Sequence, residues 1–255
     1  MGDERRFCNI SRGAMKLDVG ITKRSDEMAT KLFLSGDEIF YSIQGEGQNI
    51  GTPSVFLRLC FCNLECRWCD TKYAQKPVLK NGQERFLTVD QILKVIQTYP
   101  VKKIVITGGE PLIQQKALAV LLNKITDWDV EIETNGTIKP SAVIVARCKF
   151  NVSPKLSSSG NKKEKCFKPE ILKYFNKFTR TSFKFVVASD TDIAEIEKII
   201  KLCKLDPDKI IIMPEGTRKE KMIDDTRRLA EIAKLKGWRL IPRLHILLWG
   251  KKRKV

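Results

Sequence analysis

Val101-Lys-Lys-Ile-Val-Ile-Thr-Gly-Gly-Glu-Pro111 joins an apolar strand to a glycine turn and to a proline that suits the first turn of a helix. A segment with helical periodicity follows, at 111–125. The next two apolar runs, at 130–133 and 150–152, are again followed by small or polar residues. Strand, helix and strand repeated in this way predict an α/β fold, in which a parallel sheet has helices outside it.

The same pattern extends along the rest of the chain. Further strands are predicted at 55–59, 183–187, 210–213 and 240–241. Further helices are predicted at 89–98 after a Thr88 cap, at 192–205, and at 217–236 before Gly237. Because parallel strands place their carboxyl ends at one edge of the sheet, we expect the loops that follow them to share one site.

The composition is that of a single domain with a strong positive charge. The 255 residues are 42% hydrophobic, which is enough for a full core. Residues 1–31 are polar and predict a poorly ordered extension ahead of a core domain at 32–255. No apolar run approaches the roughly 18 residues that cross a bilayer, so no membrane contact is expected.

The 47 Lys and Arg exceed the 30 Asp and Glu by 17, which suggests an anionic partner. The excess lies mainly in a basic segment between Lys155 and Lys184 and in the tail Lys251-Lys-Arg-Lys254. Such segments bind nucleic acids or acidic proteins in some molecules, and in others they are solvated faces or frayed ends. The second interpretation is favoured here, so nucleic-acid binding is not expected.

Cys62-Asn-Leu-Glu-Cys66-Arg-Trp-Cys69 supplies three closely spaced thiolates. A four-iron cluster that only transfers electrons takes four cysteines, so three leave one iron open to a ligand. Zinc is the alternative, but no second ligand pair follows and the single histidine, His245, lies far downstream. Disulfides are disfavoured because the eight cysteines are scattered and no secretory signal precedes them, so we expect a reducing compartment.

The cysteine spacing followed by Thr107-Gly-Gly-Glu-Pro111 resembles the radical S-adenosylmethionine (SAM) superfamily. From about residue 37 to the end, the chain resembles the 7-carboxy-7-deazaguanine synthase family, and the segments that carry this likeness are Glu38-Ile-Phe-Tyr-Ser-Ile-Gln-Gly-Glu-Gly47, 51–58, Cys69-Asp-Thr71, Ser153-Pro-Lys155 and Leu244-His-Ile-Leu-Leu-Trp-Gly250. A glycyl-radical activase shares the cysteine spacing without the Gln-Gly-Glu-Gly and Cys-Asp-Thr segments. A cluster-bearing nucleic-acid-binding protein does not account for Thr-Gly-Gly-Glu-Pro.

The resemblance implies a definite reaction. Members convert 6-carboxy-5,6,7,8-tetrahydropterin to 7-carboxy-7-deazaguanine with loss of ammonia, on the route to queuosine and other 7-deazapurines. A 4Fe-4S cluster delivers an electron that cleaves SAM, and the 5′-deoxyadenosyl radical takes a hydrogen from the pterin and later returns one. The resemblance further implies Mg²⁺, an incomplete TIM-type barrel, a cytoplasmic homodimer, and an electron donor such as a flavodoxin.

The resemblance also implies the residues that hold the cofactors. Cys62, Cys66 and Cys69 would bind the cluster, and thiolates suit iron and sulfide because all are soft. The Thr71 hydroxyl would contribute to the hard oxygen environment that Mg²⁺ prefers. Contacts to SAM are expected from Trp68, Cys69, Asp70, Gly108, Gly109, Glu133, Ser153, Pro154 and Lys155. The amides of the two glycines would receive the methionyl part, whereas Lys155 by itself would be interpreted as a solvated lysine.

The pterin would be bound by Ile43, Gln44, Gly45, Arg58, Thr107 and His245. Gln44 and Glu46 match the donors and acceptors of a pterin edge. Arg58 suits the substrate carboxylate, because a guanidinium pairs with a carboxylate bidentately. Glu46 and Arg58 are the candidate catalytic residues. His245 would close the pocket from the last predicted strand, although a packed core histidine is the equal alternative.

Phe61, Cys60 and the extension at 1–31 depart from the family pattern. Phe61 stands where the family commonly has glycine, so a different loop packing is expected. Cys60 breaks the ligand spacing and is not expected to bind the cluster. A basic insertion near 156–168 is expected to replace a helix with irregular structure. Cys8, Cys148, Cys166 and Cys203 are interpreted as ordinary thiols.

Overall fold

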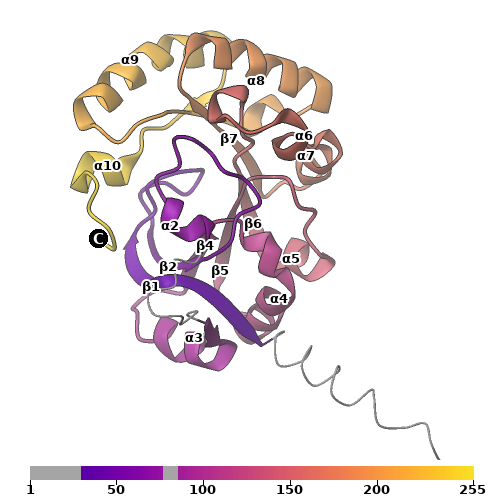
Figure 1. The fold of residues 1–255 in the computed structure, drawn as a ribbon, viewed down its shortest axis with the longest axis vertical. Coiled ribbons are helices and arrows are strands. Elements are labelled where there is room, and N and C mark those ends of the chain that lie inside the picture. Colours follow the sequence, from indigo (N-terminus) through magenta and orange to yellow (C-terminus); the bar gives the residue numbers. More distant parts are fainter. Residues whose placement is uncertain (1–29, 77–85) are drawn as a thin grey trace, which may run out of the picture.

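The computed structural model describes residues 30–76 and 86–255, which form one open nine-stranded sheet with helices outside it (Figure 1). The strands are β1 (Lys31–Ile43), β2 (Pro53–Leu59), β3 (Phe86–Thr88), β4 (Lys103–Gly108), β5 (Asp129–Thr134), β6 (Cys148–Val152), β7 (Thr181–Val187), β8 (Ile210–Pro214) and β9 (Arg239–Leu240). The helices are α2 (Lys72–Gln75), α3 (Val89–Ile96), α4 (Gln115–Lys124), α5 (Ala142–Arg147), α6 (Lys163–Cys166), α7 (Pro169–Asn176), α8 (Asp190–Cys203), α9 (Lys219–Lys236) and α10 (Leu244–Trp249), with 3-10 turns η2 (Pro111–Gln114), η3 (Ser157–Ser159) and η4 (Pro207–Lys209).

The strand order is β3-β1-β2-β4-β5-β6-β7-β8-β9. All neighbours from β2 to β9 pair in parallel, whereas β1 pairs antiparallel with both β2 and β3. Because β3 and β9 stand at opposite edges, the sheet curves without closing. The predicted incomplete TIM-type barrel is therefore confirmed.

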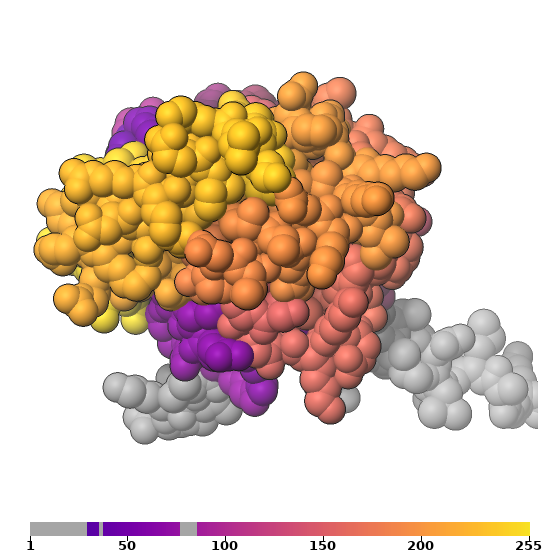
Figure 2. All heavy atoms as spheres, turned by 90° about the horizontal axis from the view of Figure 1, so that it is seen from above, coloured from indigo at the N-terminus to yellow at the C-terminus, as the bar shows by residue number. Residues whose placement is uncertain are grey.

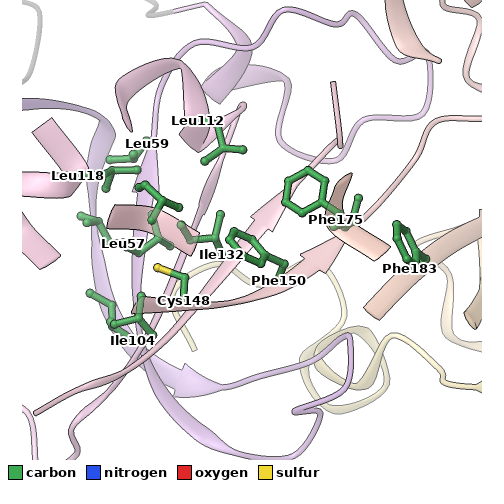
Figure 3. Close-up of a cluster of buried hydrophobic side chains, with 14 of the residues drawn as sticks. Leu57, Leu59, Ile104, Leu112, Leu118, Ile132, Cys148, Phe150, Phe175 and Phe183 are labelled. Carbon is green, nitrogen blue, oxygen red and sulfur yellow. The ribbon is translucent and has the colours of Figure 1, made fainter. Parts of the chain in front are cut away.

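One face of the sheet packs against the helices and forms the core. Leu57, Ile104, Ile132 and Phe150 lie on this face in one cluster with Leu118 of α4, and all five side chains are 0% exposed (Figure 3). Burying each such side chain stabilises the fold by roughly 1.5–3 kcal/mol.

The opposite face of the same strands is polar. Side chains alternate across a strand, so the neighbours of the outward core residues point into the barrel. These inward residues are Arg58, Thr107, Glu133, Asn151 and Lys184. The parallel register pairs Arg58 with Thr107 and Glu133 with Asn151, which aligns these residues across neighbouring strands. The strands thus carry charge on the face that the helices do not cover.

The predicted helix ends are also confirmed. Thr88 caps α3 through a capping box, in which Gln91 N donates to Thr88 Oγ1 at 3.2 Å and Thr88 N donates to Gln91 Oε1 at 2.9 Å. Gly237 ends α9 with φ 67°, the left-handed conformation that favours glycine at this position. None of the helices in the described ranges combines the length and apolar character needed to cross a bilayer.

Several elements differ from the sequence prediction. Strand β1 was not predicted, because a register shift between Leu34 and Ile39 interrupts its alternation. His245 was expected on the last strand and lies on α10 instead, since β9 ends at Leu240 and helix follows Arg243. The insertion near 156–168 contains η3 and α6 and is not wholly irregular. The poorly ordered extension predicted for 1–31 lies, up to residue 29, outside the described residues.

Candidate active site

The loops that follow the parallel strands surround a cavity of about 610 Å³ on the polar side of the sheet. Every predicted site residue lines this cavity except Pro154. Three groups of residues meet there: the cysteine loop after β2, the inward side chains of β2, β4, β5 and β7, and the chain from Arg243 to the C-terminus. The structure therefore confirms the prediction that these loops share one site, and the contacts of each residue indicate what it can do there.

The cysteine loop runs from Cys60 to Asp70 and presents three thiols to the cavity. Cys62, Cys66 and Cys69 are all unpaired and line the cavity wall. Cys60, in contrast, is buried away from the cavity, and its Sγ donates to the Leu34 carbonyl of β1 at 3.2 Å. The geometry thus separates the three predicted ligands from the cysteine that was excluded by its spacing.

Phe61 adopts φ 71°, the left-handed conformation that is unfavourable for a residue with a Cβ. Its carbonyl accepts a hydrogen bond from Glu110 N at 2.7 Å, and its ring meets Phe33 edge-on with centroids 5.5 Å apart. The conformation explains why glycine is usual at this position. The aromatic contact with Phe33 holds Phe61 in this conformation, where a glycine would need no such contact.

Gly109 brings the end of β4 against the cysteine loop. A Cβ on Gly109 would lie 2.0 Å from the Phe61 carbonyl oxygen, so only glycine fits. Gly109 N donates to the Leu59 carbonyl at 3.0 Å. This amide is therefore engaged with β2, and the contact of Gly109 with the methionyl part of SAM stays a prediction.

Glu110 locks the ends of β4 and β5 together. Its buried carboxylate accepts from Leu112 N at 3.0 Å, from Thr134 Oγ1 at 2.8 Å and from Asn135 N at 2.7 Å. Burial raises the pKa of Glu110, although these hydrogen bonds act in the opposite direction. The Thr-Gly-Gly-Glu-Pro motif thus serves to position the loops around the cysteines.

The cysteine loop has the donor set and the surroundings for an iron–sulfur cluster. Its cysteines pack with Leu64, Trp68 and Cys166 in one largely buried group, and burial raises the pKa of Cys62 to about 11 and also raises that of Cys66. Such thiols release their protons when iron binds. Across the described residues no three Cys, His, Asp or Glu side chains meet at a single-ion site, whereas the thiolates of a four-iron cluster each bind a different iron.

Polar groups beside the cysteines fit a charged cofactor. Trp68 Nε1 is buried without a hydrogen-bond partner, which leaves a donor for a ligand. Lys155 Nζ donates to Ser153 Oγ at 2.8 Å and lies 5.6 Å from the centre of the Trp68 ring. Burial lowers the pKa of Lys155, so this residue is not a solvated surface lysine.

Gln44 is held by two carboxylates on β5. Its Nε2 donates to Glu131 Oε1 at 2.8 Å and to Glu133 Oε1 at 3.1 Å, and its Oε1 accepts from Glu46 N at 3.2 Å. Both N–H groups of this amide are thereby used, and its oxygen keeps one further acceptor position. These contacts order the loop and fix the orientation of the Gln44 amide, and its contact with the pterin edge stays a prediction.

Glu133 lies in the cavity between Gln44 and Thr107. Thr107 Oγ1 donates to Glu133 Oε2 at 2.7 Å, and Gln44 donates to the other oxygen of this carboxylate. Its neighbour Glu131 is fully buried, and burial together with Glu133 raises the pKa of Glu131 to about 7. The contacts group Glu133 with predicted pterin residues, although it was expected beside SAM.

Glu46 belongs to a buried ion network. Lys184 Nζ pairs with one carboxylate oxygen of Glu46, and Arg243 Nε pairs with the other at 3.0 Å. Arg243 also pairs with Asp70, directly after Cys69. Burial alone would raise the pKa of Glu46, but the positive charges of Lys184 and Arg243 hold this pKa well below its usual range. These ion pairs fix the Glu46 carboxylate in the cavity, and its catalytic role stays a prediction.

Arg58 and the C-terminal tail meet at Glu38. Arg58 Nε donates to Glu38 Oε2 at 2.9 Å, and Arg253 pairs with the other oxygen of this buried carboxylate. The Arg253 guanidinium lies 3.8 Å from the centre of the Tyr73 ring, and Ser42 Oγ donates to the carbonyl of Val255. The tail therefore lines the cavity. The expectation that it is a frayed end was wrong.

His245 lies over the Gln44-Gly45-Glu46 loop. A Cβ on Gly45 would lie 2.2 Å from His245 Nδ1, so the imidazole fills the space that a side chain would need. Burial lowers the pKa of His245, which favours the neutral ring. His245 lines the cavity from α10 and not from the last strand, and its role in closing the pocket stays a prediction.

Sequence reasoning missed Glu38, Lys184, Arg243 and Arg253. For Lys184 there was a signal: a lysine in the middle of the apolar run Phe183-Lys-Phe-Val-Val187 must point to the inner face when its neighbours point outward. Arg243 and Arg253 gave no such signal, because their carboxylate partners are between 173 and 215 residues away in the sequence.

Comparisons with known proteins agree with the geometry. The Radical SAM superfamily model matches residues 58–147. The chain is 37% identical over 223 residues to the 7-carboxy-7-deazaguanine synthase of Pyrobaculum aerophilum, covering 85% of this chain and 95% of that protein. It is 34% identical to the protein of the same name from Halobacterium salinarum, covering 84% and 90%. The crystal structure of QueE from Escherichia coli matches with TM-score 0.64 at 27% identity, covering 84% of this chain and 95% of that one.

Proposed function

The chain belongs to the 7-carboxy-7-deazaguanine synthase family of radical SAM enzymes, and we propose that its cavity carries out that reaction through the residues described above. The substrate is 6-carboxy-5,6,7,8-tetrahydropterin, and the product is 7-carboxy-7-deazaguanine, with loss of ammonia, in queuosine biosynthesis. The observation that carries the proposal is that one cavity joins three free thiols to Arg58, Thr107 and Glu133.

Cys62, Cys66 and Cys69 would hold the 4Fe-4S cluster of the family, and the cavity beside them would hold SAM. When bound, the cluster supplies the electron that cleaves SAM and so starts hydrogen abstraction from the pterin. Trp68 Nε1 and Lys155 Nζ provide donors there for the polar groups of SAM. Asp70, Gly108 and Ser153 line the same region, whereas Gly109 and Pro154 position the backbone.

The pterin would lie against the inner face of β2, β4 and β5. Glu133 presents a carboxylate to the donors of the pterin ring, and Thr107 fixes its orientation. Glu38 fixes the plane of the Arg58 guanidinium, which then faces the substrate carboxylate. The backbone at Ile43 and Gly45 forms the third side, and His245 covers it and excludes water.

Further features are proposed from the family alone. Thr71, whose Oγ1 lies 3.6 Å from Cys69 Sγ, would contribute to a Mg²⁺ site. The working enzyme would be a cytoplasmic homodimer that receives electrons from a protein such as a flavodoxin. A reducing compartment agrees with the seven cysteines of the described residues, all of which are unpaired.

The proposal is tested by cysteine variants in an anaerobic assay. The protein is reconstituted with iron and sulfide and given a reductant, SAM, Mg²⁺ and the carboxytetrahydropterin. We expect Cys62→Ala, Cys66→Ala and Cys69→Ala each to lose the cluster absorbance and turnover. Cys60→Ala is the matched control and should keep both. An inactive but stably folded Cys60→Ala, or an active variant of any of the other three, would show that the ligand set is wrong.

A further inference from the structure

Asn161 makes a direct contact with one of the three cluster cysteines. Its Nδ2 donates to Cys66 Sγ at 3.1 Å and is also 3.1 Å from Ser159 Oγ. At the other end of the amide, Oδ1 accepts from Glu65 N at 2.9 Å. Because a backbone N–H can only donate, this contact fixes the orientation of the amide and turns its NH₂ group toward the sulfur.

The segment that carries Asn161 is held firmly against the cysteine loop. Arg67 N donates to the Ser159 carbonyl at 2.9 Å. On the far side, N and Oγ of Ser157 donate to the Glu195 carboxylate of α8 at 3.0 to 3.1 Å. Seen from above, purple surface from the first third of the chain lies directly beside salmon surface from the segment around residue 160 (Figure 2). The insertion therefore holds Asn161 in place.

The contact is specific to Cys66. The side-chain amide beside Cys62 is that of Asn135, whose Nδ2 lies 4.0 Å from Cys62 Sγ, and the Thr71 hydroxyl lies 3.6 Å from Cys69 Sγ. Cys66 is 7% exposed, so little water is available to solvate charge on its sulfur. Among neutral side chains, the Asn161 amide is thus the main source of polar stabilisation for the Cys66 sulfur.

An N–H donor acts on the charge of the group that it contacts. When a cluster held by Cys66 accepts one electron from an external donor, negative charge on its sulfur ligands increases, and a hydrogen bond to that sulfur becomes stronger. The hydrogen bond therefore stabilises the reduced state more than the oxidised state, which raises the reduction potential. Its removal leaves Lys155 and a backbone N–H to stabilise charge on this buried sulfur, so added charge becomes less favourable than with Asn161 present.

We propose that Asn161 is a positioning residue that raises the reduction potential of the 4Fe-4S cluster by donating a hydrogen bond to Cys66. The inference rests on the proposed function, because it requires that Cys66 binds the cluster. It assigns a role to the basic insertion at 156–168, namely to bring one amide to the cluster. The exposed lysines of this insertion take no part in it.

The test is a redox titration of the reconstituted protein, followed by the electron paramagnetic resonance signal of the reduced cluster. Asn161→Asp has the same shape and keeps the acceptor for Glu65 N, but it places an oxygen where the NH₂ group was. Asn161→Ala removes both ends of the amide. We expect the midpoint potential to fall in the order wild type, Asn161→Ala, Asn161→Asp, with iron and sulfide contents unchanged.

Asn176 offers a matched control at the end of α7. Its Nδ2 donates to the Lys204 carbonyl at 2.9 Å and its Oδ1 accepts from Asp206 N at 3.1 Å, so it makes the same pair of contacts without a sulfur. Asn176→Asp should leave the midpoint potential at the wild-type value. This control separates a contact with the cluster from a general effect of changing a half-buried amide to a carboxylate.

The outcomes separate this inference from the proposed function. A wild-type potential in loaded Asn161→Asp and Asn161→Ala would overturn the inference and leave the proposed function intact. Loss of the cluster from both variants, with Asn176→Asp loading normally, would also overturn it, because Asn161 would then serve assembly. A wild-type protein that binds no cluster would instead contradict the proposed function.

Discussion

Phe61 shows how one residue adapts to a backbone that suits glycine. Its φ of 71° is imposed by Gly109 and Glu110, which pack against and bind its carbonyl. A left-handed conformation costs a residue with a Cβ roughly 1–2 kcal/mol. The edge-on contact with Phe33 offsets about 1 kcal/mol of this.

Substitutions at position 61 test this conformation. Phe61→Gly and Phe61→Ala both lose the ring, but only glycine adopts positive φ without strain. We expect Phe61→Gly to be more stable than Phe61→Ala by about 1 kcal/mol in anaerobic urea unfolding. The reverse order, which is usual at negative φ, would contradict the conformation assigned to Phe61.

Glu131 gives a prediction for pH dependence. Its pKa is about 7 in the folded protein, because burial and Glu133 disfavour its charge, against about 4.3 in an unfolded chain. The folded state therefore retains a proton that the unfolded state releases, and the stability from this group falls as pH rises from about 4.3 to 7. Between pH 5 and 8, wild type should lose about 2–3 kcal/mol of unfolding free energy relative to Glu131→Gln.

The comparison uses the pH-dependent difference between the two proteins, since Glu131→Gln also disturbs the contacts with Gln44 and Asn49. Urea unfolding at several pH values measures that difference. A difference that stays constant over the whole range would show that Glu131 is ionised at all these pH values.

At the scale of elements, the ion pair between β7 and the loop after β1 holds two sides of the cavity together. The Lys184 side chain is 8% exposed and that of Glu46 14%, so removing one partner leaves a buried charge. We expect Lys184→Met to cost about 3 kcal/mol, and Lys184→Met with Glu46→Gln to cost less than the single change. Unfolding free energies of the three proteins measure this.

An exposed ion pair provides the control. Lys102 and Asp127 are 68% and 57% exposed, and Lys102→Met should cost less than about 1 kcal/mol. If Lys184→Met costs no more than Lys102→Met, the buried network does not stabilise the fold.

The C-terminal tail gives a second prediction at this scale. Arg253 joins the tail to Glu38 and Tyr73, beside the proposed position of the substrate carboxylate. Arg253→Ala should raise KM for the pterin by about threefold to tenfold, which corresponds to about 1 kcal/mol. Lys252→Ala is the control in the same tail and should leave KM at the wild-type value. An unchanged KM in Arg253→Ala would exclude the tail from substrate binding.

At the scale of the whole molecule, the parallel sheet was predictable because apolar runs such as 103–108 alternate with helical periods. The cavity was predictable because the motifs follow those strands. The contacts of Gln44, Glu46 and Gly109 were not, since each depends on a partner from another strand or loop: Glu133, Lys184 and Phe61. Residues such as Arg243 became visible only when the fold brought distant segments together.

The central claim is that this cavity turns a carboxytetrahydropterin into a deazapurine, and product identity tests it most directly. The reconstituted wild-type protein is incubated anaerobically with reductant, SAM and Mg²⁺, with either 6-carboxy-5,6,7,8-tetrahydropterin or the tetrahydropterin that lacks the carboxylate. Mass spectrometry should show 7-carboxy-7-deazaguanine and one equivalent of ammonia from the first compound and no ring contraction of the second. A fully loaded cluster that yields no deazapurine from the carboxytetrahydropterin would contradict the account.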